Sequence, residues 1–185
     1  DGQIKARLLF HSAFFHPAVA IRRELFEWAG YSAKYPRAED YDLWCRLALS
    51  PKSRFFNLPE ALIRYRVSKR GLSLGGREEQ LASTREVREK FLRGAGIGNR
   101  AGLDLYHAMA DGSLPAAVDP AAMESFFALL GQIKKWNLIS GYAPAEALNA
   151  EVMPRFTSLA GRIGGMAADC AEIMKKSGFY QRGAV

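Results

Sequence analysis

The stretch 37-RAEDYDLWCRL-47 places three acids, Glu39, Asp40 and Asp42, at the start of a helical pattern. An amphipathic run follows them through Leu43, Trp44, Leu47 and Ala48. Acids near a helix N-terminus are common caps, and the helix dipole stabilises their charge. The sequence therefore leaves two interpretations open: the acids cap the helix and pair with Arg37 and Arg46, or one of them takes part in chemistry.

The composition predicts a folded domain. The chain has 185 residues, of which 49% are hydrophobic and 24% charged. Lysine and arginine exceed the acids by 26 − 19 = 7, which favours an anionic partner. These basic residues are spread along the chain, so nucleic acid is not singled out. Cys45 and Cys170 stand far apart, which predicts buried free thiols in a reducing compartment.

Two segments in the first part of the chain have the pattern of β-strands. In 16-HPAVAIRREL-25, Val19 and Ile21 alternate with smaller or polar residues. A helix is predicted over residues 24–29. The segment 54-RFFNLPEALIRYRV-67 then predicts strand, turn and strand, with one apolar face formed by Ile63, Tyr65 and Val67.

Residues 75–185 predict a small helical bundle after a hinge-like loop at 68–77. Asp119 and Pro120 form a helix N-cap and first-turn pair. The last helix is expected to begin near Pro154. The predicted inward stripes are Leu81, Thr84, Val87 and Phe91; Leu103, Tyr106 and Met109; Met123, Phe126, Phe127, Leu130 and Ile133; and Phe156, Leu159, Ile163, Met166, Cys170 and Ile173.

Residues 4–73 resemble the acceptor-side half of a family 2 glycosyltransferase with the GT-A fold. The resemblance is carried, in this order, by 16-HPAVAIRREL-25, 38-AEDYDLWCRLA-48 and 57-NLPEALIRYRV-67, which ends in Leu72-Ser73. It implies an α/β fragment: over 1–74, the C-terminal part of a Rossmann-like GT-A domain with a few short strands. A helical extension over 75–185 would make the whole predominantly α by content.

The resemblance implies transfer of a sugar from a nucleotide-sugar donor to an acceptor hydroxyl, with inversion, in the synthesis of bacterial surface polysaccharide or another glycoconjugate. Such chemistry needs one base, because the departing diphosphate needs little protonation. By the resemblance Asp40 is that base, and Glu39 orients the acceptor or the loop. The helix dipole should keep Asp40 ionised, while the charges of Glu39 and Asp42 oppose this effect.

The resemblance further implies substrate contacts from His16, Asp42, Arg66, Lys69 and Arg70. Ser68 stands where the family has a histidine near the diphosphate, so this loop supplies no expected metal ligand. Lys69 and Arg70 are cations that can bind a diphosphate instead. The residues alone leave other interpretations open. His16 could make a structural hydrogen bond, Asp42 could have a structural role, and Lys69 and Arg70 could belong to a solvated basic loop.

The sequence also predicts that the chain is part of a longer protein. It begins DGQIKARLLF, with no initiator methionine and no nucleotide-binding half, so it should be inactive alone. A divalent metal, Mg or Mn, is expected in the whole enzyme, with its main ligands absent from this chain. The expected partners are the donor, a saccharide or lipid-linked acceptor, the missing N-terminal half, and a second copy bound through an exposed sheet edge or the helical tail.

Two further expectations concern location and function class. The enzyme interpretation places the protein in the cytoplasm, with the inner face of the membrane as an alternative site. The competing function is a non-catalytic helical module that binds another protein, in which the acids are only caps. A basic nucleic-acid-binding domain ranks lower, because no aromatic-interleaved basic stripe is present.

Overall fold

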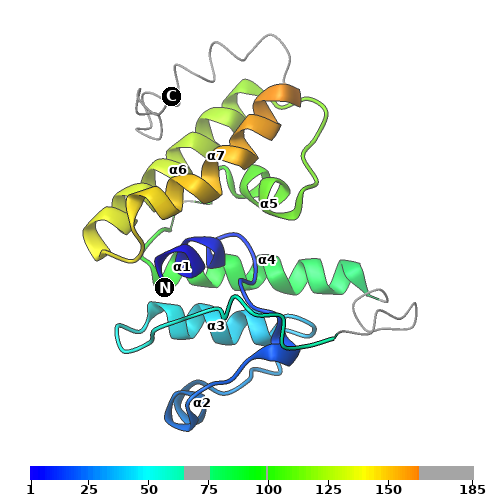
Figure 1. Cartoon of the computed structure of the whole chain (residues 1–185). Coiled ribbons are helices and arrows are strands. Elements are labelled where there is room, and N and C mark those ends of the chain that lie inside the picture. The colour runs from blue at the N-terminus through cyan, green and yellow to red at the C-terminus, as the bar shows by residue number, and fades with distance from the viewer. Residues whose placement is uncertain (65–75, 99, 163–185) are drawn as a thin grey trace. The chain divides into compact units, whose positions relative to one another are not determined.

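The computed structural model describes residues 1–64, 76–98 and 100–162. All regular structure in these ranges is helical (Figure 1). The elements are α1 (Gly2–Leu8), the short 3₁₀ helix η1 (His16–Ala18), α2 (Arg23–Ala29), α3 (Glu39–Leu49), α4 (Arg77–Gly94), α5 (Leu103–Asp111), α6 (Pro120–Ser140) and α7 (Ala145–Arg162).

The chain divides into two compact units. The first gathers nearly all of residues 1–95 and the second those from residue 96 onward. The predicted division at residues 74 and 75 falls in 65–75, outside the described residues, and it stays a prediction. Helix α4, which the sequence placed with the C-terminal extension, belongs to the first compact unit.

The prediction of an α/β fragment of a GT-A domain with short strands is wrong. The described residues contain no strand. The backbone at Val19 is extended, with φ −97° and ψ 134°, but it follows η1 directly, and its amide donates to the His16 carbonyl rather than to a strand. A strand needs a hydrogen-bonded partner as well as an extended backbone. The prediction of a predominantly helical chain is confirmed.

The predicted strand pair at 54–67 fails for a related reason. Its apolar side chains do not face a core: Phe56 is 74% exposed and Leu62 is 71% exposed. Alternating apolar residues favour a strand only when one face is buried. Residues 65–67 lie outside the described residues. Since the described part of the chain has no strand, the sheet edge expected to bind a second copy has no counterpart there.

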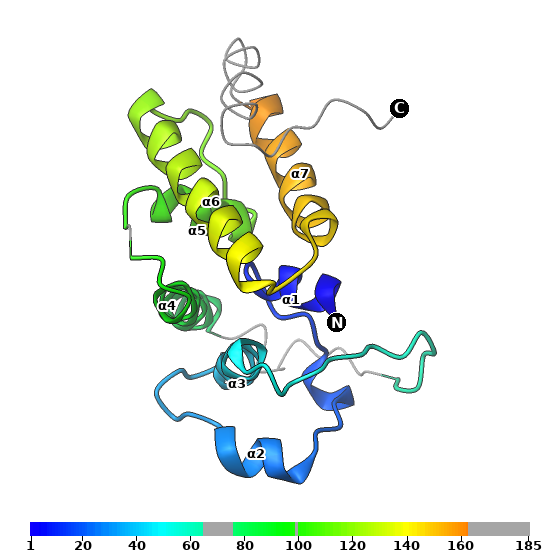
Figure 2. The ribbon, with the colours of Figure 1, turned by 90° about the vertical axis from the view of Figure 1, so that its left-hand side faces the viewer.

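In the first unit, α3 packs against α2 on one side and α4 on the other (Figure 2). Two buried hydrogen bonds tie the end of α1 and the segment after it to this layer. The Tyr41 hydroxyl of α3 donates to the Leu8 carbonyl at 2.7 Å, and Arg88 of α4 donates through Nε to the Phe10 carbonyl at 2.6 Å. Side chains on the buried face of α3 form much of the core, among them Leu43, Trp44, Cys45 and Leu47.

In the second unit, α5, α6 and α7 pack against one another. The predicted inward residues of α5 and α6 are all buried, which confirms both stripes. Asp119 accepts a hydrogen bond from the Ala122 amide at 3.2 Å and Pro120 begins α6, as predicted. Helix α7 begins at Ala145 rather than near Pro154, which lies inside it. The rest of the predicted last stripe, from Ile163 onward, lies outside the described residues.

Candidate functional site

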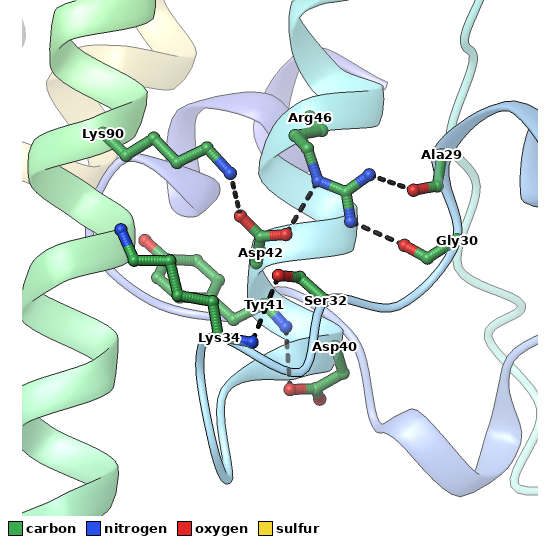
Figure 3. Close-up of polar contacts among 9 residues, drawn as sticks. All are labelled: Ala29, Gly30, Ser32, Lys34, Asp40, Tyr41, Asp42, Arg46 and Lys90. Atoms are coloured by element: carbon green, nitrogen blue, oxygen red, sulfur yellow. Dashed lines mark hydrogen bonds and ion pairs between the residues drawn. The ribbon is translucent and has the colours of Figure 1, made fainter.

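The acid cluster begins α3, and its members face different surroundings. Residues two positions apart on an α-helix point about 200° apart around its axis. Figure 3 shows the result: Asp42 lies between α4 and the end of α2, whereas Asp40 lies away from them. The two carboxylates therefore cannot act on one substrate group.

Asp42 is buried in an ion-pair network, with a side chain only 1% exposed. Its Oδ1 accepts a hydrogen bond from Lys90 Nζ of α4 at 2.7 Å, and its Oδ2 accepts one from Arg46 Nε at 2.7 Å. Arg46 also donates to the carbonyl oxygens of Ala29 and Gly30, where α2 ends (Figure 3). Asp42 thus links α2, α3 and α4, and the substrate contact predicted for it has no support here. The sequence analysis left open that the acids pair with Arg37 and Arg46, and Asp42 does pair with Arg46.

Asp40 keeps access to solvent, with a side chain 21% exposed. Its Oδ1 accepts a hydrogen bond from the Tyr41 amide at 2.7 Å (Figure 3). Its Oδ2 lies 3.8 Å from Nδ1 of His16, the first residue of η1. One carboxylate oxygen therefore accepts a backbone hydrogen bond, while the other lies near an imidazole.

His16 connects Asp40 to a residue that the sequence interpretation missed. The second ring nitrogen of His16, Nε2, lies 2.8 Å from the Tyr31 hydroxyl. The two rings meet edge to face, with centroids 5.5 Å apart. Tyr31 follows α2 in the segment 31-YSAKYPRA-38, whose turn composition gave no sign of a site. Only the path of the chain brings it opposite His16.

Burial raises the pKa of the Asp40 carboxyl above its ordinary value, and the charge of Glu39 adds to this rise. The Tyr41 amide and the charge of His16 act in the opposite direction and lower the pKa of Asp40. The sequence predicted the opposing effects of the helix start and of Glu39. Burial, which is the largest cause, could not be read from the sequence.

Trp44 forms the buried floor beside His16. Its side chain is buried, and its ring meets Phe14 at 5.2 Å and His16 at 6.3 Å, both edge to face. A stacking contact with a sugar needs an exposed ring face, so core packing accounts for Trp44 better. Its indole Nε1 is buried without a hydrogen-bond partner in the part of the chain that the structure describes.

The structure thus brings His16, Glu39 and Asp40 together and adds Tyr31, while it places Asp42 elsewhere. Glu39 is half-buried at the first position of α3. The predicted diphosphate-binding residues Arg66, Lys69 and Arg70, with Ser68, lie outside the described residues. Their roles stay predictions from the resemblance.

The described residues do not fit a metal site. Within 1–64, 76–98 and 100–162, no group of three or more His, Cys, Asp or Glu side chains could hold a metal ion. Among the same residues, no helix combines the length and apolar character needed to cross a bilayer.

Comparisons of the chain with protein-family models, with curated proteins and with solved structures found no match. Function must consequently be argued from the site itself.

Proposed function

We propose that this chain supplies the acceptor side of an inverting glycosyltransferase similar to family 2, with Asp40 as the catalytic base. The observation that carries the proposal is the environment of the Asp40 carboxylate. Its side chain is partly shielded but still 21% exposed, its Oδ2 lies 3.8 Å from His16 Nδ1, and burial raises its pKa. A base needs contact with its substrate and enough proton affinity, and the partial exposure and raised pKa of Asp40 support both.

The reaction assigned to Asp40 is a single displacement. The acceptor hydroxyl oxygen forms a bond to the anomeric carbon of the donor sugar, while the bond from that carbon to the diphosphate breaks. The hydroxyl proton passes to Oδ2 of Asp40, and the nucleoside diphosphate leaves with the electron pair. Glu39 lies next to Asp40 and its negative charge raises the proton affinity of the base.

A saccharide acceptor fits the surroundings of Asp40. Sugar rings have apolar C–H faces that pack on aromatic rings, and their hydroxyls bind carboxylates. Tyr31 is 50% exposed and contacts Phe26, which is 36% exposed, with ring centroids 5.2 Å apart. The contact between the Tyr31 hydroxyl and His16 places these aromatic side chains next to the site.

The proposal includes the partners that the resemblance implies. They are the nucleotide-sugar donor, a saccharide or lipid-linked acceptor, and a nucleotide-binding half that would also hold the divalent metal. The apolar segment 54–64 supports a missing polypeptide partner, because exposed apolar clusters mark interaction surfaces. Its exposed side chains are Phe56, Leu58, Leu62 and Ile63. The proposed location is the cytoplasm or the inner face of the membrane.

The test is an assay of the longer protein that contains this chain and a nucleotide-binding half. It is incubated with α-linked nucleotide sugars and with saccharide or lipid-linked acceptors, and the products are examined by NMR. The expected result is a new glycosidic bond with β configuration at the transferred sugar. Retention of the α configuration would contradict the proposed single displacement, and absence of any transfer across the series would contradict the enzyme assignment.

A second candidate function, a protein-binding module, is favoured by the C-terminal end of α6. Leu138 is 77% exposed and its neighbour Ile139 is 74% exposed. Adjacent exposed apolar side chains on one helix are typical of a protein contact. The module needs no free carboxylate, so Asp40→Asn would leave partner binding intact, whereas Leu138→Ser would weaken it.

A further inference from the structure

We infer that Tyr31 is a positioning residue for the base: its hydroxyl holds the His16 imidazole so that Nδ1 faces the Asp40 carboxylate. The inference rests on the proposed role of Asp40 in glycosyl transfer and extends it to Tyr31, for which no role was predicted from the sequence. Three elements contribute, namely η1 with His16, the segment between α2 and α3 with Tyr31, and the start of α3 with Asp40.

Both ring nitrogens of His16 are directed to a polar neighbour. Nε2 lies 2.8 Å from the Tyr31 hydroxyl, within hydrogen-bond distance, and Nδ1 lies 3.8 Å from Asp40 Oδ2. The second distance is too long for a hydrogen bond. Because the bond to Tyr31 is the shorter of the two, Tyr31 fixes the ring, and the ring's orientation toward Asp40 follows.

Aromatic contacts restrict the position of the His16 imidazole but do not fix its orientation. Trp44 and Tyr31 each meet the imidazole edge to face, at 6.3 Å and 5.5 Å between centroids. The side chain of His16 is still 38% exposed. Without the Tyr31 hydroxyl, the polar contact recorded for the imidazole is the one with Asp40 at 3.8 Å, which is longer than a hydrogen bond.

The position of the imidazole matters because it acts on the charge of the base. The charged and titratable groups that face Asp40 are His16 from η1, Glu39 from α3 itself and Tyr31 from the segment after α2. A positive imidazole favours the ionised carboxylate, whereas Glu39 favours the neutral one. By holding the imidazole in place, Tyr31 determines how strongly His16 lowers the pKa of Asp40.

The test is a titration of the Asp40 carboxyl carbon by NMR in the chain itself, which requires no substrate. Tyr31→Phe keeps the ring and removes the hydroxyl, and His16→Gln removes the imidazole. Both variants should raise the pKa of Asp40, because each withdraws the imidazole. The double variant should match His16→Gln alone, since Tyr31 acts through His16. Tyr35→Phe removes a hydroxyl elsewhere in the same unit and should leave the titration unchanged.

Two results would overturn the inference. One is a Tyr31→Phe titration that coincides with the wild type. The other is a double variant in which the two effects add, because Tyr31 would then act on Asp40 independently of His16. In an active protein that joins this chain to the proposed nucleotide-binding half, Tyr31→Phe should shift the acidic limb of the kcat profile to higher pH. A wild type that transfers no sugar contradicts the proposed function. The NMR titrations of the variants test the role of Tyr31 separately, because they need no activity.

Discussion

Asp40 and Asp42 show how far two identical side chains in one helical turn can differ. Asp42 is buried and held by two cations, so its charge stabilises the fold. Asp40 is shielded with a backbone amide on one oxygen and an imidazole 3.8 Å from the other. A carboxylate kept in such surroundings costs stability, and functional sites commonly carry that kind of cost.

The first prediction concerns the stability of Asp40→Asn. Burial raises the pKa of Asp40 in the folded state above its ordinary value of 3.8. The unfolded chain therefore gives up this proton more readily, and stability falls as the pH rises through the folded pKa. At pH 7 we expect Asp40→Asn to unfold at a higher urea concentration than the wild type, because the amide carries no buried charge and can still accept the Tyr41 amide.

The advantage of Asp40→Asn should shrink as the pH is lowered through the folded-state pKa of the wild-type carboxyl, because that carboxyl then becomes neutral as well. Asp104→Asn serves as the control, since Asp104 is an exposed acid in the first turn of α5. A variant that is less stable than the wild type at pH 7 would contradict the pKa assignment.

The second prediction concerns Asp42→Asn. Loss of this carboxylate leaves Arg46 and Lys90 without their shared partner and loosens the contacts of α3 with α2 and α4. Removing one partner of a buried ion pair costs about 3–5 kcal/mol. We expect the free energy of unfolding to fall by about 3 kcal/mol, the lower end of this range, because both cations keep access to water. Urea unfolding measures it, and a loss below about 0.5 kcal/mol would show that the network is not structural.

At the scale of the elements, helices were easier to predict than strands. The stripe from Met123 to Ile133 and the cap at Asp119 specify α6 locally, because both act within a few turns of one helix. Gly30 ends α2 with φ 53°, a backbone conformation that favours glycine. The apolar alternation at Val19 and at Phe56 depends on a distant partner strand, about which the sequence of the segment itself says nothing.

The third prediction concerns the cap of α6. The Asp119 side chain accepts from the Ala122 amide, so Asp119→Ala leaves this amide without its protein partner. N-cap replacements of this kind cost about 1 kcal/mol. Thermal unfolding of the second unit should detect the loss, while Glu124→Ala, an exposed change within the same helix, should have an effect of at most about 0.5 kcal/mol. Equal stability of the two variants would contradict the capping role.

At the scale of the whole molecule, the candidate site belongs entirely to the first compact unit. The sequence could locate its centre, because the acid pair and the histidine lie in the motifs that carry the resemblance. The sequence could not identify Tyr31 as part of the site, because that depends on where the segment after α2 runs. It also could not decide between a substrate contact and a structural role for Asp42, because that depends on which way α3 faces. The resemblance also implied a sheet that the described residues do not contain.

The fourth prediction, the rate of glycosyl transfer by Asp40→Asn, tests the central claim most directly. It is measured in a protein that joins this chain to the proposed nucleotide-binding half, at saturating donor and acceptor, with donor affinity determined in parallel. Loss of a general base should lower the rate by about 10²–10⁴-fold. Donor affinity should stay unchanged, and the fold should be at least as stable as the wild type. Asp104→Asn should keep the wild-type rate. A transfer rate for Asp40→Asn equal to that of the wild type would contradict the assignment of Asp40 as the base and return it to the role of a helix cap.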